Sequence, residues 1–510
     1  MSAVQPTQIR ISGGNARRAL MMFVALPIMT FLVFGLTVAM DYPSNRYAMI
    51  GLSLLTMMVG LVPAILDYAR PADRRHLLLT VYCLLFIAHF ALPIFTQYAS
   101  AIMPSDPPGV SGGALYPSDV VAGQGVLLFG LLSLLLGYGL LPVQLTDRDI
   151  ERRKARDWRP EIILVVAGTM LILGWTISIS AALGLIPAIL GSGVISTVAS
   201  SVVFGNALLT IAYLRHRSLV ALLMLLIAVP ISATLGFFTG SKRMTLIVPA
   251  VVVFTSMLLG GRFRTRWIVI GALTLTLLYP ISEVYRGTVL QGYDLTIVDA
   301  LSDPEYTLRV LSDFLTSSET EAYLGTGLAS TAARLDAVGI VSVIVRDTPS
   351  AVPFQDGRTL GLFFVAFIPR LFWPGKPPIT LGQWITDTYG SGAHIHSATG
   401  PSFIGDLYLN FGVASVVVGM LVLGALLRLV QTRLLGPHPT AVGILAAIVV
   451  MMQLITKQIA SAAYVLSATA FAFAPVFAVS IAVAILARRS PPPQMQAWGD
   501  QNASGSSDLP

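Results

Sequence analysis

Residues 121–141 read VAGQGVLLFGLLSLLLGYGLL, a continuous run without a charged side chain. A run of this length can cross the hydrocarbon core of a bilayer, which takes about 20 apolar residues in an α-helix. Inside lipid a spanning segment of this type must satisfy its own backbone hydrogen bonds, and the helix does so. The run therefore predicts a transmembrane helix.

Similar runs recur along the 510 residues, of which 55% are hydrophobic and 11% charged. Ordinary soluble domains carry about 25% charged residues, so water is not the main solvent of this chain. We predict an all-α polytopic membrane protein with about twelve transmembrane helices. The expected spans are 19–40, 47–65, 77–95, 121–141, 162–182, 195–214, 219–238, 244–260, 267–284, 407–427, 441–456 and 463–486.

The positions of the basic residues predict the orientation, because Lys and Arg near spans are retained on the cytoplasmic face. Most of the 32 Lys and Arg residues fall in alternate short loops, such as the loop that contains Arg152, Arg153 and Lys154. Both termini are therefore expected in the cytoplasm. The predicted parts are a cytoplasmic N-terminus (1–18), a bundle of about nine spans (19–284), an extracytoplasmic segment (285–402), about three further spans (403–489) and a disordered cytoplasmic tail (490–510).

The extracytoplasmic segment lies between spans nine and ten and is expected to be partly helical. Residues 304–323 follow Asp303, a typical N-cap residue, and residues 327–345 are rich in alanine and apolar on one face. The run 360–372 is too short to span a bilayer and contains Pro369. It suits a helix at the outer interface, with Trp373 at the level of the lipid headgroups.

Several functional classes find little support in the sequence. The basic residues form no continuous patch for nucleic acid, and Cys83 is the only cysteine, so neither a disulfide nor a cysteine-based metal site is expected. His394 and His396 are too few ligands for a metal. The Asp147 and Asp149 pair lies in a loop too short for a nucleotide-binding domain. We expect no metal and no cofactor.

The most specific sequence lies at 361–390, GLFFVAFIPRLFWPGKPPITLGQWITDTYG, and at 403–412, FIGDLYLNFG. The pairing of IPRLFWPGKP with a G-acid-xYxNFG motif, together with GSKR at 240–243 and ARLDAV at 333–338, resembles the O-antigen polymerase family of bacteria. The resemblance covers about residues 240–428. Asp406 departs from the pattern, in which a glutamate is expected.

This resemblance implies a glycosyltransferase of the bacterial inner membrane. The enzyme would transfer a growing glycan from undecaprenyl pyrophosphate to a new lipid-linked repeat unit at the outer face, for an O-antigen or an exopolysaccharide. Its partners would be undecaprenyl-pyrophosphate-linked oligosaccharides and membrane lipids, with a chain-length regulator and a flippase of the same pathway.

This chemistry needs cations on the leaving phosphates and a carboxylate base for the attacking hydroxyl. Arg370 and Asp406 are the main candidates, with Asp336 as a further catalytic carboxylate and Glu283 as a third choice. The basic residues near Arg243 and Arg370 are expected to converge on one diphosphate, although headgroup anchoring would also explain them. The candidate binding residues for pyrophosphate or glycan are Arg243, Arg286, Arg334, Arg370, Lys376 and Tyr408.

Two other functions remain open at this point. An O-antigen ligase, which transfers a finished glycan to a lipid-A core, would need the same outer cations. A flippase or other transporter would suit twelve spans with both termini inside, but transporters place polar sites near the bilayer midplane, whereas the polar candidates here gather outside the spans.

Overall fold

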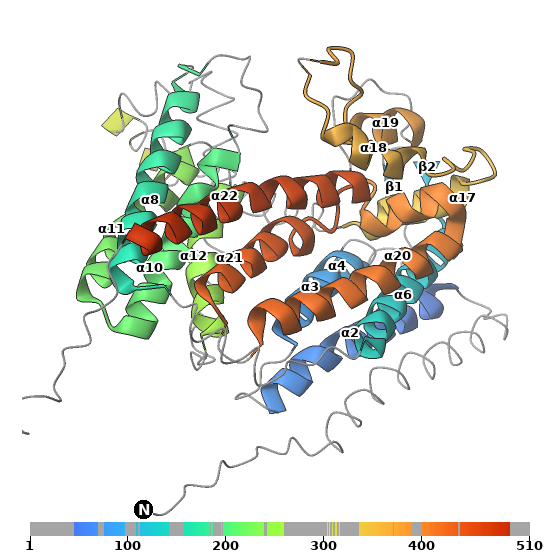
Figure 1. Cartoon of the computed structure of the whole chain (residues 1–510). Helices are drawn as coiled ribbons and strands as arrows, with labels where there is room; N and C mark the ends of the chain where they lie inside the picture. Colours follow the sequence, from blue (N-terminus) through green and yellow to red (C-terminus); the bar gives the residue numbers. More distant parts are fainter. Residues whose placement is uncertain are drawn as a thin grey trace, which may run out of the picture.

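The computed structural model describes residues 45–69, 76–96, 109–110, 113–141, 158–183, 185–186, 195, 197–238, 242–259, 336–370, 372–389, 400–436 and 439–489, with single residues between 303 and 316. The regular structure in these parts is helical apart from one short antiparallel pair, β1 (Gly109–Val110) with β2 (Gly113–Ala114), and turns and loops join the elements. Figure 1 shows the helices in two adjoining groups.

Ten of the twelve expected spans fall on described residues, and a helix occupies each of them. Eight described helices are long and apolar enough to cross a membrane, whereas the helices near 245–258 and 441–455 are shorter. The expected spans 19–40 and 267–284 lie outside the described residues, as does the tail. The helices are α2 (Asn45–Ala69), α3 (Leu77–Phe90) with α4 (Pro93–Thr96), α6 (Pro117–Leu140), α8 (Pro160–Ala182), α10 (Ser201–His216), α11 (Leu219–Phe238), α12 (Lys242–Leu258), α20 (Phe403–Leu435), α21 (Ala441–Val449) with the π-helix η3 (Val450–Ile455), and α22 (Ala462–Arg489).

Helix α6 packs closely on α20, and the two run side by side in Figure 1. Glycines at 123, 130 and 137 recur every seven residues and so share one face of α6. A Cβ on Gly137 would lie 2.0 Å from the carbonyl oxygen of Leu421, and one on Gly424 would lie 2.0 Å from that of Leu134. Small residues of this kind let helix backbones approach closely in a membrane.

Helix α20 is kinked at Phe411 and Gly412, whose backbone angles are not helical. Gly412 has φ +65°, a conformation that glycine adopts without steric cost. The hydroxyl of Ser415 donates to the carbonyls of Leu407 and Gly412 and so satisfies acceptors that the kink would expose. The kink separates a short first part of α20 from the long remainder.

A second group of helices comprises α8, α10, α11 and α12, which contact one another. The indole of Trp175 on α8 donates to the hydroxyl of Ser232 on α11 at 3.1 Å. The hydroxyl of Ser201 on α10 donates to the carbonyl of Met170 on α8. Helices α21 and α22 contact helices of this group and also contact α20, so they join this group to α6 and α20.

Three helices lie in the described part of segment 285–402: α17 (Val338–Asp347), α18 (Arg358–Ala366) and α19 (Gly382–Tyr389). Helix α18 confirms a short helix at the start of the run 360–372, but the helix ends at Ala366, before Pro369. The prediction of one continuous helix over 327–345 is wrong, because Asp336 and Ala337 are not helical and α17 begins at Val338. Of the helix expected over 304–323 only single residues are described, and Asp303 accepts the capping hydrogen bond from the Tyr306 amide.

Candidate functional site

The candidate residues with described side chains gather mainly around helix α18. This helix packs against α20 and α22. Its last turn contacts α22 through the rings of Phe367 and Phe471, whose centroids are 5.0 Å apart. Hydrogen bonds through Asp406 connect its first turn to the start of α22.

At the first turn of α18, the hydroxyl of Thr359 donates to Oδ1 of Asp406 at 2.6 Å. The other carboxylate oxygen, Oδ2, accepts from the backbone amide of Ala462, the first residue of α22, at 2.8 Å. The side chain of Asn410 donates to the Thr359 hydroxyl and to the Asp406 carbonyl. One carboxylate therefore joins α18, α20 and α22.

Asp406 is fully buried, with 0% of its surface exposed. It lies in the first turn of α20 and caps the first turn of α22, and the positive ends of two helix dipoles stabilise its negative charge. The geometry therefore makes this carboxylate a latch between helices. Both carboxylate oxygens accept from groups of the protein, and none of the residue's surface is exposed.

At the opposite end of α18, the ammonium of Lys376 donates to the carbonyls of Ala366 and Ile368, each at 2.8 Å. The Ala366 carbonyl ends α18 and the Ile368 carbonyl follows it in the turn; acceptors at a helix C-terminus lack partners within the helix, so a cation is favourable there. Only 9% of the Lys376 surface is exposed. Burial lowers the pKa of the Lys376 ammonium, and the nearby charge of Arg370 lowers it further. Lys376 therefore points into the protein, and its two described contacts are with carbonyls.

Arg370 is exposed on the turn that follows α18. Its Nη1 donates to the backbone carbonyl of Lys376 at 3.1 Å, and no carboxylate of the described residues pairs with it. The neighbouring side chains Phe372 and Trp373 are 78% and 40% exposed. The turn thus presents a guanidinium close in sequence to exposed aromatic rings, with a second cation, Lys376, nearby.

The lengths of α18 and α22 place Asp406 and Arg370 apart. From Thr359 to Phe367 a helix rises about 12 Å, and from Ala462 to Phe471 about 13 Å. Contacts at both ends therefore mean that α18 runs parallel to the first turns of α22. Asp406 lies at one end of α18 and Arg370 beyond the other, so the two do not form one cluster.

The remaining candidates lie elsewhere. Asp336 accepts from the amides of Val338 and Gly339 and thus caps α17. The hydroxyl of Tyr408 is 3.5 Å from the Thr348 carbonyl, and its ring meets Phe354 edge to face. Arg243 lies in the first turn of α12, with its side chain outside the described parts. Glu283, Arg286, Arg334, His394, His396, Asp147 and Asp149 also fall outside them.

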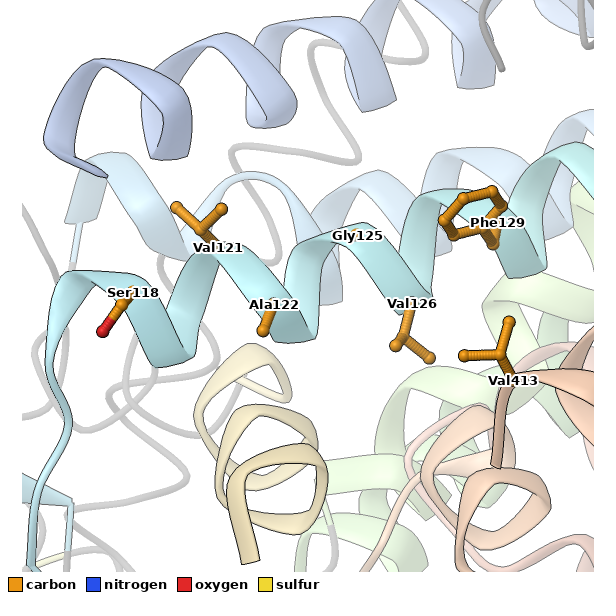
Figure 2. Close-up of a pocket in the computed structure, with 7 residues that line it drawn as sticks. All are labelled: Ser118, Val121, Ala122, Gly125, Val126, Phe129 and Val413. Carbon is orange, nitrogen blue, oxygen red and sulfur yellow. The ribbon is translucent and has the colours of Figure 1, made fainter. Parts of the chain in front are cut away.

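A groove of about 270 Å³ lies along α6. Figure 2 shows the aliphatic side chains of Val121 and Val126 along it, with Ser118 at one end and Val413 of α20 at the other. Its lining contains no charged group that could bind a phosphate. Within the described residues, no group of three or more His, Cys, Asp or Glu side chains could hold a metal ion.

A family model described as "Domain of unknown function (DUF8712)" matches residues 128–480, which is most of the chain. The chain belongs to the DUF8712 family. The match to DUF8712 includes α18, the Arg370 turn and the Asp406 latch. No curated protein and no solved structure is detectably similar to the chain.

Sequence reasoning missed two members of the latch, Thr359 and Asn410. Asn410 belongs to the quoted NFG motif, so the motif itself was the available signal. Thr359 had no such signal, because its hydroxyl becomes significant only when α18 lies against α20. The amide oxygen of Asn410 is buried without a hydrogen-bond partner among the described residues.

Proposed function

We propose that the protein is a glycosyltransferase of the bacterial inner membrane that extends a glycan carried on a polyprenyl diphosphate at the outer face. Arg370 binds the diphosphate. The observation that carries the proposal is the pair of neighbouring cations, Arg370 and Lys376, with no carboxylate beside Arg370 among the described residues. Two cations held together without an acid favour an anionic ligand.

The depth of the Arg370 turn supports a lipid-borne substrate. Arg488 and Arg489 mark the predicted cytoplasmic end of α22. About 20 residues cross the hydrocarbon core, so its outer boundary falls near Ala468. Phe471, which contacts Phe367, lies within about one turn of that boundary. Exposed Phe372 and Trp373 beside Arg370 also suit the headgroup level, where lipid phosphates lie.

The reaction would form a bond between an acceptor hydroxyl oxygen and the anomeric carbon of the growing glycan. The bond from that carbon to the diphosphate breaks, and the diphosphate leaves with the added charge. A guanidinium can stabilise this charge by donating to two phosphate oxygens at once. Both oxygens of the buried Asp406 are already bonded within the protein, so we assign the hydroxyl proton to an exposed carboxylate of the same stretch, Asp387.

The test is to incubate purified protein in lipid nanodiscs with lipid-linked repeat units. We expect products of two, three and more repeat units from the natural protein. Arg370→Ala should abolish the ladder because the leaving diphosphate loses its cation, and Arg370→Lys should restore it only in part, since lysine lacks the planar fork. Removing one such donor typically costs about 100-fold to 1,000-fold in rate.

The matched control is Arg358→Ala, because Arg358 is also exposed and lies on α18, but at its first turn. This variant should keep the full ladder. A normal ladder from Arg370→Ala at normal expression would contradict the proposal. Transfer to a lipid-A core without repeat-unit products would identify a ligase instead, and movement of intact lipid-linked units across the bilayer would identify a flippase.

A further inference from the structure

We infer that Lys376 is a positioning residue that locks the turn after α18 (residues 367–370 and 372–377) onto the end of that helix and thereby aims Arg370 at its anionic ligand. This inference rests on the proposed function, since it concerns the same cation site. It changes the role expected of Lys376 from a phosphate ligand to a support for the residue that binds phosphate.

The Lys376 side chain is already occupied by hydrogen bonds within the protein. Its ammonium donates to Ala366 and Ile368 at 2.8 Å each, and the residue is almost fully buried. Reaching a phosphate outside would leave the carbonyl of the buried Ala366 without its Lys376 donor, together with the part-buried carbonyl of Ile368. A buried carbonyl left without a donor destabilises the arrangement that exposes it to this loss.

The backbone of Lys376 also holds Arg370. The Lys376 carbonyl accepts from Nη1 of Arg370 at 3.1 Å, and the Lys376 amide donates to the Trp373 carbonyl at 3.1 Å. Side chain and backbone of one residue therefore tie three points together: the end of α18, the aromatic turn and the guanidinium. Loss of the ammonium contacts would free the carbonyl that orients Arg370.

The two cations are close enough for Arg370 to lower the pKa of Lys376, so their mutual repulsion opposes the closed turn. The carbonyls of Ala366 and Ile368 offset this repulsion at Lys376. At Arg370, no carboxylate of the described residues does the same. An arriving diphosphate would supply that compensation to Arg370, while Lys376 stays in place.

The test uses Lys376→Met, which keeps most of the chain length but removes the charge, and Lys376→Arg, which keeps the charge and the donors. Trypsin cleaves after Arg370, and the fragment that begins at Leu371 reports opening of the turn. We expect faster appearance of this fragment from folded Lys376→Met in detergent and near-normal protection in Lys376→Arg. This readout does not depend on any enzymatic activity.

In the transfer assay, Lys376→Met should lose about 100-fold, the scale of a 1 Å misplacement of a catalytic group, and Lys376→Arg should recover most of the rate. The loss should nearly vanish when Lys376→Met is added to Arg370→Ala, because a residue that acts through Arg370 has nothing left to position. Additive losses, or a raised KM with unchanged tryptic cleavage, would overturn the inference. Transfer activity in Arg370→Ala would instead contradict the proposed function. The tryptic cleavage would then test only whether Lys376 holds the turn closed.

Discussion

Asp406 shows how burial changes the role of a carboxylate. In the sequence, Asp406 is a carboxylate at the start of a predicted span, which suggests a catalytic base. In the structure its two oxygens accept from the Thr359 hydroxyl and the Ala462 amide, and no surface is exposed. The charge is therefore used to hold three helices together.

Replacing Asp406 by Asn tests this role. The amide would offer one acceptor and one NH2 donor to partners that both donate, so one donor would be left unsatisfied in the interior. We expect a loss of about 1–3 kcal/mol in stability, seen as a lower thermal unfolding midpoint in detergent. Thr359→Val, which removes only the hydroxyl partner, should lower the midpoint less. A catalytic base would behave differently: Asp406→Asn would keep the normal midpoint and lose activity alone.

At the scale of elements, the contact between α6 and α20 depends on glycine. A Cβ on Gly137 would overlap the Leu421 carbonyl, which belongs to the backbone and cannot rotate away. Gly137→Ala should therefore push the helices apart and cost about 1–3 kcal/mol, the usual range for overpacking. The measurement is the unfolding midpoint, together with the amount of protein recovered in the membrane.

Gly51→Ala on α2 is the matched control, because a Cβ there meets nothing within 4 Å among the described residues. Alanine favours a helix over glycine by about 1 kcal/mol, so this variant should be unchanged or slightly more stable. Equal midpoints for Gly137→Ala and Gly51→Ala would show that the close approach of α6 and α20 is not needed for stability.

The helices were largely predictable from the sequence, whereas the contacts between them were not. An apolar run without charge is a local property, and it sufficed to predict the ten spans on which described helices lie. The bond from Asp406 to Ala462 joins residues 56 positions apart, and nothing in either segment indicates the other. The sequence also did not indicate that the Lys376 side chain points into the protein, because a lysine next to prolines can point either inward or toward solvent. The seven-residue recurrence of glycine on α6 was visible, and it would have indicated a tightly packed face.

At the scale of the whole molecule, the proposed chemistry requires α18 and α19 to lie on the extracytoplasmic side. The alternation of basic loops predicts that the loop after α10 lies inside and the segment after residue 285 outside. Cys83 is fully buried on α3, so single introduced cysteines can report each side with little background.

We expect Gln383→Cys, at an exposed position of α19, to react with a membrane-impermeant maleimide in intact spheroplasts, which expose the outer face of the inner membrane. His216→Cys, exposed at the end of α10, should react only after the membrane is permeabilised. The unmodified chain, with Cys83 alone, measures the background in both conditions. Labelling of His216→Cys in intact spheroplasts, with Gln383→Cys protected, would reverse the orientation and place Arg370 on the cytoplasmic side. A transferase that meets its lipid-linked donor at the outer face could not then use this cation, so this single comparison tests the placement on which the enzymatic proposal depends.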